Sequence, residues 1–265
     1  MKIAFIGTGN MGSACAKAAR AALPQAELLL ANRTQAKAAA LAAELGARVT
    51  DNRRAAEEAE FLVLGVKPQM LETLAGEIGD VTAGRENLVL VSMAAGVTVE
   101  RLNALFGKRL PVIRMMPNLP VTLGKGVTLW CANDRVTAVE KQVFCAMFEK
   151  SGVLSELPER LIDAGSAVSG CGPAFVCLFL EAMADGAVAC GLPRGHALEY
   201  AAYTLLGTAG LLLETGKHPG EVKDAVCSPA GSTIAGVRAL ENGAFRADVM
   251  NAVIAAFERT KELGN

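Results

Sequence analysis

The most constraining feature of this sequence is a glycine-rich turn that follows a short apolar strand. Residues 2–6 are β-rich and apolar, and Gly7 to Gly12 follow with the spacing GxGxxG before an alanine-rich stretch that predicts a helix. The first glycine of such a turn permits a tight bend, the second admits a pyrophosphate, and the third lets helix pack on strand. The sequence therefore predicts a dinucleotide site at a helix N-terminus, with a ligand-free turn as the alternative.

Up to about residue 160, short β-rich runs alternate with alanine-rich amphipathic stretches, the pattern of βαβ units and a mainly parallel sheet. Thr34 and Gly46 bracket the second helical stretch as its expected cap and stop. We therefore predict an α/β Rossmann-type dinucleotide-binding domain over residues 1–160. The expected strands are residues 2–6, 27–31, 48–50, 61–66, 88–92 and 109–115, with two more near 126–131 and 153–157 that flank a helical stretch at 136–150.

After about residue 160 the pattern changes, because residues 163–190, 193–215 and 244–263 predict helices with no convincing strand between them. Residues 161–265 are therefore expected to form an all-α domain. Glu181 and Asp185 interrupt its longest apolar stretch, residues 174–190, so we interpret that stretch as a buried helix rather than a membrane span. The leucines of residues 205–213 predict surface that is hidden either against another subunit or inside the helical bundle.

Composition narrows the class of protein. Hydrophobic residues make up 52% of the chain, and 26 Lys and Arg nearly balance 27 Asp and Glu, which predicts no surface for nucleic acid or anionic membrane. The seven cysteines form no CxxC pair and mostly lie in apolar runs expected to be core. With no signal-peptide pattern before Gly7, a cytoplasmic location is expected. His196 and His218 lack partners at metal-ligand spacing, so we expect no metal.

The end of the second strand bears on the choice of dinucleotide. NAD sites place a carboxylate there for the ribose 2′-hydroxyl, but this chain has Asn32, Arg33 and Thr34. Arg33 can neutralise a 2′-phosphate, and Asn32 and Thr34 can donate hydrogen bonds. NADPH is the expected cofactor, with NADH as a weaker alternative, although an exposed arginine is more commonly a solvated surface charge.

Three further segments follow strands at the carboxyl edge of the sheet, where open α/β sheets bind ligands. The Val-Lys-Pro loop at residues 66–68 offers Lys67, for which a catalytic role, a structural role and a contact with a cofactor phosphate all remain open. The small residues after Met93 would let a nicotinamide ring lie close to the backbone. Asn118 ends the next strand and is a candidate for the same crevice.

A second candidate site lies near the C-terminus, in a polar, glycine-containing turn within residues 223–236. The backbone amides around Gly231, Ser232 and Thr233 are expected at the start of a helix, where they suit a small carboxylate. An ordinary helix cap, with a serine or threonine stabilising the first turn, is the simpler alternative.

Several motifs occur together in the order typical of one enzyme family. Beside GxGN at 7–10 they are Val-Lys-Pro (66–68), Ser-x-Ala-Ala-Gly (92–96), Ser-Gly-Cys-Gly-Pro-Ala (169–174), His-Pro-Gly (218–220) and the segment 224–240. Each is weak alone, but their order and spacing make essentially the whole chain resemble the pyrroline-5-carboxylate reductase family. The resemblance implies reduction of the cyclic imine 1-pyrroline-5-carboxylate to L-proline, the last step of proline biosynthesis.

The resemblance also implies an architecture and a set of site residues. A Rossmann domain would precede a helical dimerisation domain, with the active site between them. The chain would form homodimers, which in this family can assemble further into decamers. Thr233 matches the threonine that meets the substrate nitrogen and is the expected catalytic residue. Gly231, Ser232 and Thr233 match the turn that holds the substrate carboxylate, and with Ser228 and Asn118 they are the expected substrate-binding residues.

The expected cofactor-binding residues combine positions that match the family with positions argued from the residues themselves. Arg33 belongs to the second kind, because members of the family vary there. The full set is Ile6, Gly7, Thr8, Gly9, Asn10, Met11, Gly12, Asn32, Arg33, Thr34, Asn52, Val66, Lys67, Pro68, Met93, Ala94 and Ala95.

The expected chemistry is hydride transfer from the nicotinamide C4 to the C=N carbon. A cyclic imine can be protonated before it binds, which explains the lack of an obvious acid or base. Thr233 would orient the nitrogen or relay a proton. A β-hydroxyacid dehydrogenase is the nearest rival, but its Gly-x-Gly-x-x-x-Lys pattern places Val176 where it needs lysine. A non-catalytic NADP sensor is a second rival, which would not need the turn at 228–233.

Overall fold

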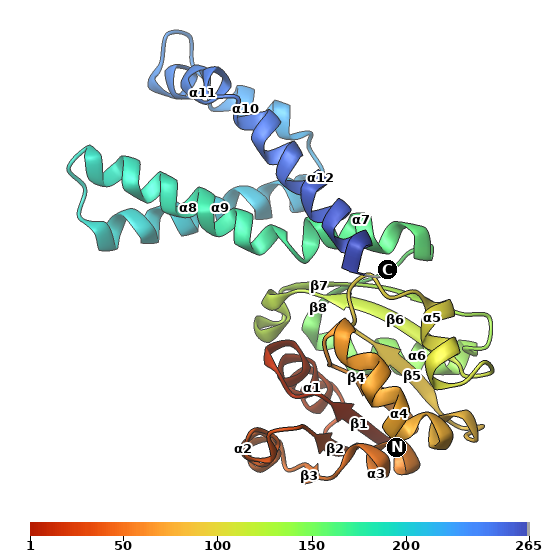
Figure 1. The fold of residues 1–265 in the computed structure, drawn as a ribbon. Coiled ribbons are helices and arrows are strands. Elements are labelled where there is room, and N and C mark those ends of the chain that lie inside the picture. Colours follow the sequence, from red (N-terminus) through yellow and green to blue (C-terminus); the bar gives the residue numbers. More distant parts are fainter. Residues whose placement is uncertain (264–265) are drawn as a thin grey trace. The chain divides into compact units, whose positions relative to one another are not determined.

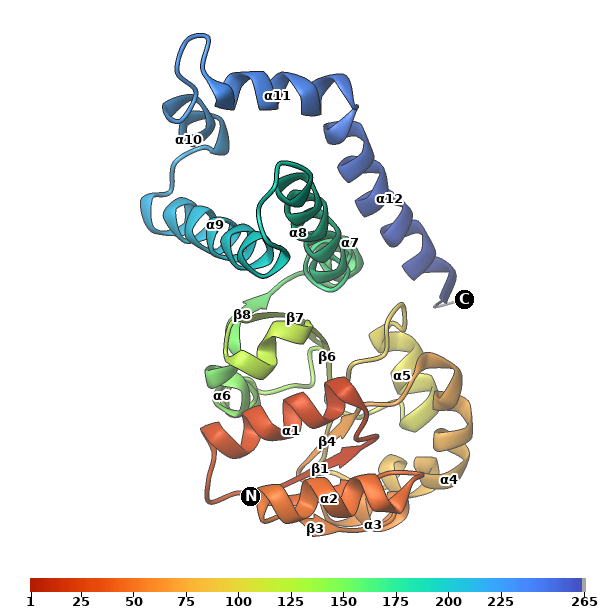
Figure 2. The ribbon, with the colours of Figure 1, turned by 90° about the vertical axis from the view of Figure 1, so that its left-hand side faces the viewer.

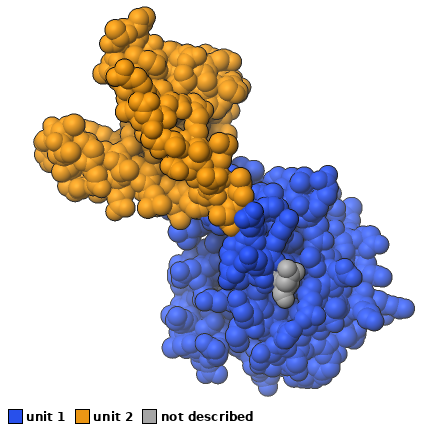
Figure 3. All heavy atoms as spheres, turned by 45° about the horizontal axis from the view of Figure 1, so that its top comes forward, with its two compact units in different colours: residues 1–171, 256–265 blue, residues 172–255 orange. Residues whose placement is uncertain are grey.

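A computed structural model gives the fold and describes residues 1–263 (Figures 1 and 2). The chain divides into two compact units, one formed by Met1–Cys171 together with the chain from Ala256 onward, the other by Gly172–Ala255 (Figure 3). The first unit is built on one sheet with helices on its faces, and the second contains only helices among its regular elements. The expected fold class, a Rossmann-type α/β domain followed by an all-α domain, is confirmed.

The α/β unit is built on an eight-stranded sheet. Its strands are β1 (Lys2–Ile6), β2 (Glu27–Ala31), β3 (Arg48–Val49), β4 (Phe61–Leu64), β5 (Val89–Ser92), β6 (Val112–Pro117), β7 (Gly126–Ala132) and β8 (Gly152–Glu156). They lie in the order β3-β2-β1-β4-β5-β6-β7-β8, and every neighbouring pair is parallel except β6 with β7. The order reverses between β1 and β4, so the carboxyl ends of these strands form the switch point where such sheets bind ligands.

Each expected strand is present, with ends that differ by a few residues. The largest difference is at β6, which begins at Val112 rather than at residue 109. The preceding residues form a turn in which the Leu110 amide donates to the Gly107 carbonyl at 3.2 Å, and Pro111 has no amide hydrogen to donate. The turn therefore delays entry into the sheet.

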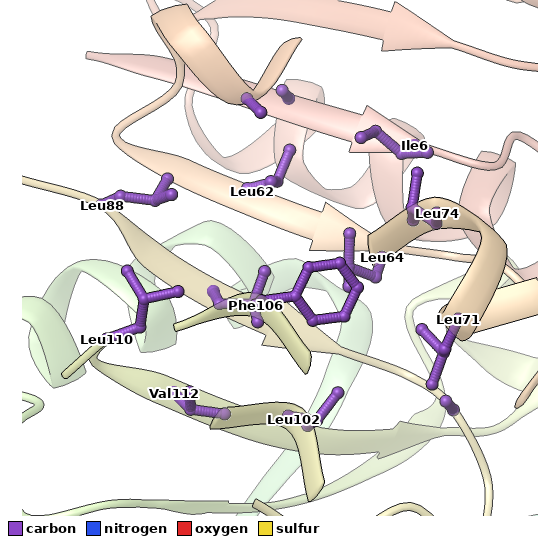
Figure 4. Close-up of a cluster of buried hydrophobic side chains, with 14 of the residues drawn as sticks. Ile6, Leu62, Leu64, Leu71, Leu74, Leu88, Leu102, Phe106, Leu110 and Val112 are labelled. Atoms are coloured by element: carbon purple, nitrogen blue, oxygen red, sulfur yellow. The ribbon is translucent and has the colours of Figure 1, made fainter. Parts of the chain in front are cut away.

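Helices cover both faces of the sheet. One face carries α1 (Asn10–Ala22), α2 (Gln35–Leu45) and α6 (Ala138–Phe148), and the other carries α3 (Asn52–Glu58), α4 (Leu71–Ala83), α5 (Val99–Phe106) and α7 (Glu159–Ser169). Figure 4 shows Leu62 and Leu64 of β4 in one buried cluster with Phe106 of α5, in the second of these layers. Burial on both faces explains why the central strands are continuous apolar runs rather than alternating ones.

The two ends of α2 agree only in part with the prediction from the sequence. Gly46 ends α2 with a left-handed backbone (φ 60°), as expected of a stop. Thr34 occupies the position that precedes α2, but its side chain makes no capping hydrogen bond. Thr34 therefore has the predicted position but does not form the predicted capping hydrogen bond, and its hydroxyl is available to bind another group.

A buried arginine joins the sheet to α7. Arg114 of β6 is 1% exposed, and its guanidinium pairs with Asp163 and lies 3.7 Å from the Glu159 carboxylate. Glu159 also accepts a hydrogen bond of 2.7 Å from the amide of Val99 at the start of α5. Because a buried charge is costly without a partner, this cluster fixes α7 against the sheet.

The helical unit contains α8 (Gly172–Ala189), α9 (Arg194–Thr215), α10 (Pro219–Ala225), α11 (Ser232–Asn242) and the first part of α12 (Phe245–Leu263). The short 3-10 turns η1 (Pro68–Met70), η2 (Leu119–Leu123) and η3 (Glu149–Ser151) belong to the α/β unit. Neighbouring α8 and α9 form a helical hairpin (Figures 1 and 2). The sequence predicts α9 and α12 closely, and joins α7 and α8 into one stretch.

The expectation that residues 174–190 form a buried helix is wrong for the single chain. Of the residues in α8 only Ala184 is buried, and the side chains of Val176, Leu178 and Met183 are exposed. The expectation that the cysteines are mostly core is wrong as well, because only Cys15 and Cys131 are buried. An apolar helix that its own chain does not cover needs another surface to lie against.

The stretch Glu159–Ala189 has the length and composition of a membrane span, but the core helix of a soluble protein can have the same length and composition. In the structure it is not one uninterrupted element, because α7 ends at Ser169 and α8 begins at Gly172. Glu181 and Asp185 lie within α8. Charged residues at these positions disfavour a span.

The buried arginine cluster yields a stability prediction. Replacing Arg114 by Leu leaves Asp163 without its cation, and we expect the free energy of unfolding of the α/β unit to fall by about 3–5 kcal/mol. The matched control is Arg101→Leu, which breaks an exposed pair with Glu72 and should cost about 1 kcal/mol or less. Urea unfolding followed by the fluorescence of Trp130 in β7 measures both, and equal losses would contradict the assignment.

Candidate functional site

A groove of about 510 Å³ lies at the switch point of the sheet, beside the ends of β1 and β4. It takes residues from the glycine-rich turn, the end of β2, the start of α3, the loop after β4 and one face of α4. The expected cofactor residues among its lining are Ile6, Gly7, Gly9, Asn32, Arg33, Thr34, Asn52, Val66 and Lys67. Sequence patterns from four separate segments thus point to one cavity.

Glycine is required where the turn approaches the end of β4. Gly7 has φ 94°, and a Cβ added to it would lie 2.8 Å from the carbonyl carbon of Gly65. A Cβ on Gly12 would overlap the Gly7 carbonyl oxygen. Gly9 differs, because no protein atom lies within 4 Å of an added Cβ and the residue lines the groove. The open space at Gly9 is therefore available to a ligand that approaches the backbone closely.

The side-chain amide of Asn32 forms hydrogen bonds within the protein through both its oxygen and its nitrogen. Its Oδ1 accepts a hydrogen bond of 3.2 Å from the Thr8 amide, and its Nδ2 donates to the Thr34 carbonyl at 3.0 Å. The side chain therefore ties the glycine-rich turn to the loop that precedes α2. Asn32 sets the distance between the two segments that would hold opposite ends of an adenosine diphosphate.

The groove is electropositive. Helices α1 and α2, whose first turns adjoin it, have no acidic residue in those turns. Of the charged side chains that line it, Arg33, Lys37 and Lys67 are positive and Glu77 is negative, and among the described residues none of the three cations forms an ion pair with a carboxylate. Helix N-termini and unpaired cations together favour a phosphorylated ligand.

Part of the lining was not predicted from the sequence. Asn52 donates from Nδ2 to the Glu77 carboxylate of α4 at 2.7 Å, so a carboxylate also faces the groove. Met70, Thr73 and Glu77 recur at helical spacing after the Val-Lys-Pro loop, and that spacing was the available signal. The lining residues missed are Lys37, Gly65, Met70, Thr73, Leu74 and Glu77.

The remaining expected cofactor residues do not line this groove: they are Thr8, Asn10, Met11, Gly12, Pro68, Met93, Ala94 and Ala95. Thr8 is 4% exposed, and its buried Oγ1 has no hydrogen-bond partner within the described residues. Met93 continues the β5 ladder through its amide, which donates to the Leu64 carbonyl at 3.1 Å. The loop after β5 therefore starts beside the end of β4, at the same edge of the sheet as the groove.

Asn118 has a structural role. It is 7% exposed, its Oδ1 accepts from the Val127 amide at 2.8 Å, and its Nδ2 donates to the Ser169 carbonyl at 2.9 Å. These bonds join the end of β6 to β7 and to the end of α7. They account for an amide at this position without a substrate.

The second candidate site is the turn that starts α11. Gly231 occupies the N-cap position without a side-chain cap, and within the described residues the amides of Ser232 and Thr233 have no hydrogen-bond partner. Ala230 precedes it with φ 57°, a left-handed conformation that is unfavourable for a residue other than glycine. Ser228 belongs to the same turn, because its carbonyl accepts from the Gly231 amide at 3.1 Å. The free amides can bind a carboxylate.

Comparison with known proteins adds two family matches. Residues 159–263 match the family described as pyrroline-5-carboxylate reductase dimerisation, and residues 2–96 match the family described as NADP oxidoreductase, coenzyme F420-dependent. The chain is therefore similar to one enzyme family over its helical part and to an NADP-binding family over its nucleotide part.

Individual relatives match over nearly the full length. A pyrroline-5-carboxylate reductase of Methanosarcina acetivorans is 42% identical, covering 99% of this chain and 98% of the relative. One from Synechocystis is 44% identical over 81% of this chain and 79% of the relative. The crystal structure of Plasmodium falciparum pyrroline carboxylate reductase with NADP bound is 28% identical and superposes with a TM-score of 0.90, covering 100% of this chain and 98% of that one.

The surroundings of Gly9 and Gly12 predict that alanine at Gly9 weakens cofactor binding, whereas alanine at Gly12 lowers stability. In Gly9→Ala the free energy of unfolding should stay within about 0.5 kcal/mol, while the Kd for NADPH rises about tenfold or more because the methyl group meets the pyrophosphate. In Gly12→Ala the overlap with Gly7 should lower the free energy of unfolding by about 1–3 kcal/mol. Calorimetric titration and urea unfolding separate the two, and unchanged NADPH binding by Gly9→Ala would contradict the proposed approach.

A second prediction concerns Cys15, whose Sγ lies 3.6 Å from Met93 Sδ beside the glycine-rich turn. Burial raises the pKa of the Cys15 thiol to about 12. The thiol therefore stays protonated through neutral and mildly alkaline pH and cannot act as a base or nucleophile there. We expect iodoacetamide at pH 8 to spare Cys15 in the native protein, as peptide mass spectrometry would show. Labelling as fast as in the unfolded chain would contradict this.

Proposed function

The chain belongs to the pyrroline-5-carboxylate reductase family, and from that membership we propose that it reduces 1-pyrroline-5-carboxylate to L-proline with NADPH as the hydride donor. The observation that carries this function is the full-length match to a pyrroline-5-carboxylate reductase of another organism, covering both units. Formation of L-proline from the imine is the last step of proline biosynthesis. The enzyme is thus an oxidoreductase that acts on a carbon–nitrogen bond.

The residues of the groove fit NADP. Gly9 leaves room for a pyrophosphate at the backbone, and Arg33 offers a cation where an NAD site would have a carboxylate. Lys67 is suited to a phosphate, and the loop of Met93, Ala94 and Ala95 to the nicotinamide end. When bound, NADPH supplies the hydride. The protein's contribution at this site is to hold and orient.

The turn at the start of α11 would hold the substrate. The amides of Ser232 and Thr233 have no capping side chain, so they would bind the carboxylate of the imine. The strained backbone of Ala230 supports a functional role, because unfavourable conformations persist where the surrounding structure maintains them for a purpose. Ser228 and Gly231 shape the turn.

Thr233 would act on the substrate nitrogen. An iminium needs no strong acid from the protein, because a cyclic imine can bind already protonated. The Thr233 hydroxyl would accept a hydrogen bond from the iminium N–H, or relay a proton once the amine has formed. Orientation of the two rings accounts for much of the expected rate enhancement.

The absence of a lysine in α8 argues against carbonyl chemistry. Val176, which occupies the position where a β-hydroxyacid dehydrogenase needs its lysine, is 40% exposed and apolar. Helix α8 contains no lysine or arginine at all. Oxidation of an alcohol at that position would therefore lack a proton acceptor.

The helical domain is a dimerisation domain, so the enzyme is a homo-oligomer. We propose a homodimer whose apolar α8 and α9 surfaces lie against the second copy, with decamers as the higher assembly. Residues 1–160 would bind the dinucleotide, and residues 161–265 the substrate and the second subunit. We also propose a cytoplasmic location, since nothing in the charge pattern suggests nucleic acid or a membrane surface as a partner.

The function is tested by following NADPH oxidation at the nicotinamide absorbance. With purified protein we expect oxidation that depends on pyrroline-5-carboxylate and yields proline, a slower rate with NADH, and no reduction of NADP⁺ by a β-hydroxyacid. Turnover of the hydroxyacid without turnover of the imine would favour the dehydrogenase, and tight NADPH binding without turnover would favour the sensor.

A variant of Thr233 tests the substrate turn. We expect Thr233→Ala to lower kcat about tenfold to a hundredfold, because one positioned hydrogen bond or proton relay is lost, while the Kd for NADPH stays unchanged. The control is Thr208→Ala in α9, whose hydroxyl donates only to the Thr204 carbonyl of its own helix. Full kcat and KM in Thr233→Ala would remove this residue from the mechanism.

A further inference from the structure

We propose that Lys37, in the first turn of α2, is a second cation for the 2′-phosphate of NADP, and that with Arg33 it sets the preference for NADPH over NADH. The inference rests on the NADP site of the proposed function. It adds a residue that determines specificity and that sequence motifs alone did not indicate.

The position of Lys37 follows from the way α2 packs. Its amide donates to the Thr34 carbonyl at 3.0 Å, so it belongs to the first turn, and it lines the groove with Arg33 and Thr34. The next residue, Ala38, is fully buried in the layer between α2 and the sheet. Burial of Ala38 fixes the rotation of α2 and keeps Lys37 at the rim of the groove rather than on the far side of the helix.

Lys37 differs from the neighbouring cations in its ion pairing. Arg48, Arg53 and Arg54 all form ion pairs with carboxylates, and Lys17 of α1 pairs with Glu44 at 2.7 Å. In the described part of the chain, no carboxylate lies within ion-pair distance of Lys37 or Arg33. Two unpaired cations at one end of a groove repel each other, and a doubly charged phosphate would remove that repulsion.

The other polar groups of the groove are less suited than Lys37 to bind the 2′-phosphate. The Asn32 amide is already bonded on both sides, to Thr8 and Thr34. Glu77 brings a carboxylate into the groove from α4, where it holds Asn52, and would repel a phosphate placed near it. The 2′-phosphate is therefore favoured on the α2 side, where the Thr34 hydroxyl has no capping role.

The test compares two fragments of the cofactor by calorimetric titration of the full-length protein. Adenosine 2′,5′-bisphosphate carries the 2′-phosphate and 5′-AMP does not. We expect Lys37→Met to weaken the bisphosphate about tenfold, as loss of one charge-assisted contact does, and to leave 5′-AMP within about twofold. Binding of the bisphosphate should also depend less on salt.

Two matched variants complete the design. Lys17→Met removes a cation outside the groove and should leave the affinity for both fragments unchanged, while Lys37→Arg should retain most of the preference for the bisphosphate. Equal loss for both fragments, or no loss for either, would overturn the role of Lys37, as would a wild-type protein that does not prefer the bisphosphate. Imine turnover is not needed for these readouts, so an enzyme inactive on pyrroline-5-carboxylate would refute the proposed function alone.

Discussion

The dinucleotide groove depends on a close approach between three glycine backbones. Gly7 follows β1, Gly12 lies in α1 and Gly65 follows β4, and a Cβ added to any one of them would collide with the backbone of another. The strand order reverses between β1 and β4, so this contact brings together the two turns that border the switch point. Asn32 then ties the glycine-rich turn to the start of α2, beside Arg33 and Lys37, the cations that we propose for a 2′-phosphate.

The α/β fold was predictable because its local signals agree. Strands covered on both faces are continuous apolar runs, and the GxGxxG spacing carries its own steric requirements. The roles of Asn32 and Asn118 were not predictable, since their partners lie 24 and 51 residues away in the sequence. An amide looks the same in a sequence whether it contacts a ligand or braces two segments. Lys37 was missed for a related reason, because only the packing of α2 brings it to the groove.

In the helical unit, the burial predicted from the sequence is not found in the single chain. Hydrophobic content predicts the helices well, yet Ala184 is the one buried residue of α8, and no residue of α11 or α12 is buried. The match to a dimerisation family offers the reason, because a dimerisation domain buries apolar surface against a second copy, as we propose for α8 and α9. The same unit carries the Thr233 turn, whose uncapped amides and strained Ala230 distinguish it from an ordinary helix start.

Hydride transfer to the imine carbon is tested most directly with NADPH that carries deuterium on the transferred position of C4. Proline formed from pyrroline-5-carboxylate should then contain one deuterium, located at proline C5 by mass spectrometry and proton NMR, since proline C5 derives from the C=N carbon of the imine. Proline without deuterium, or deuterium at any other carbon, would contradict direct transfer from the cofactor to the imine.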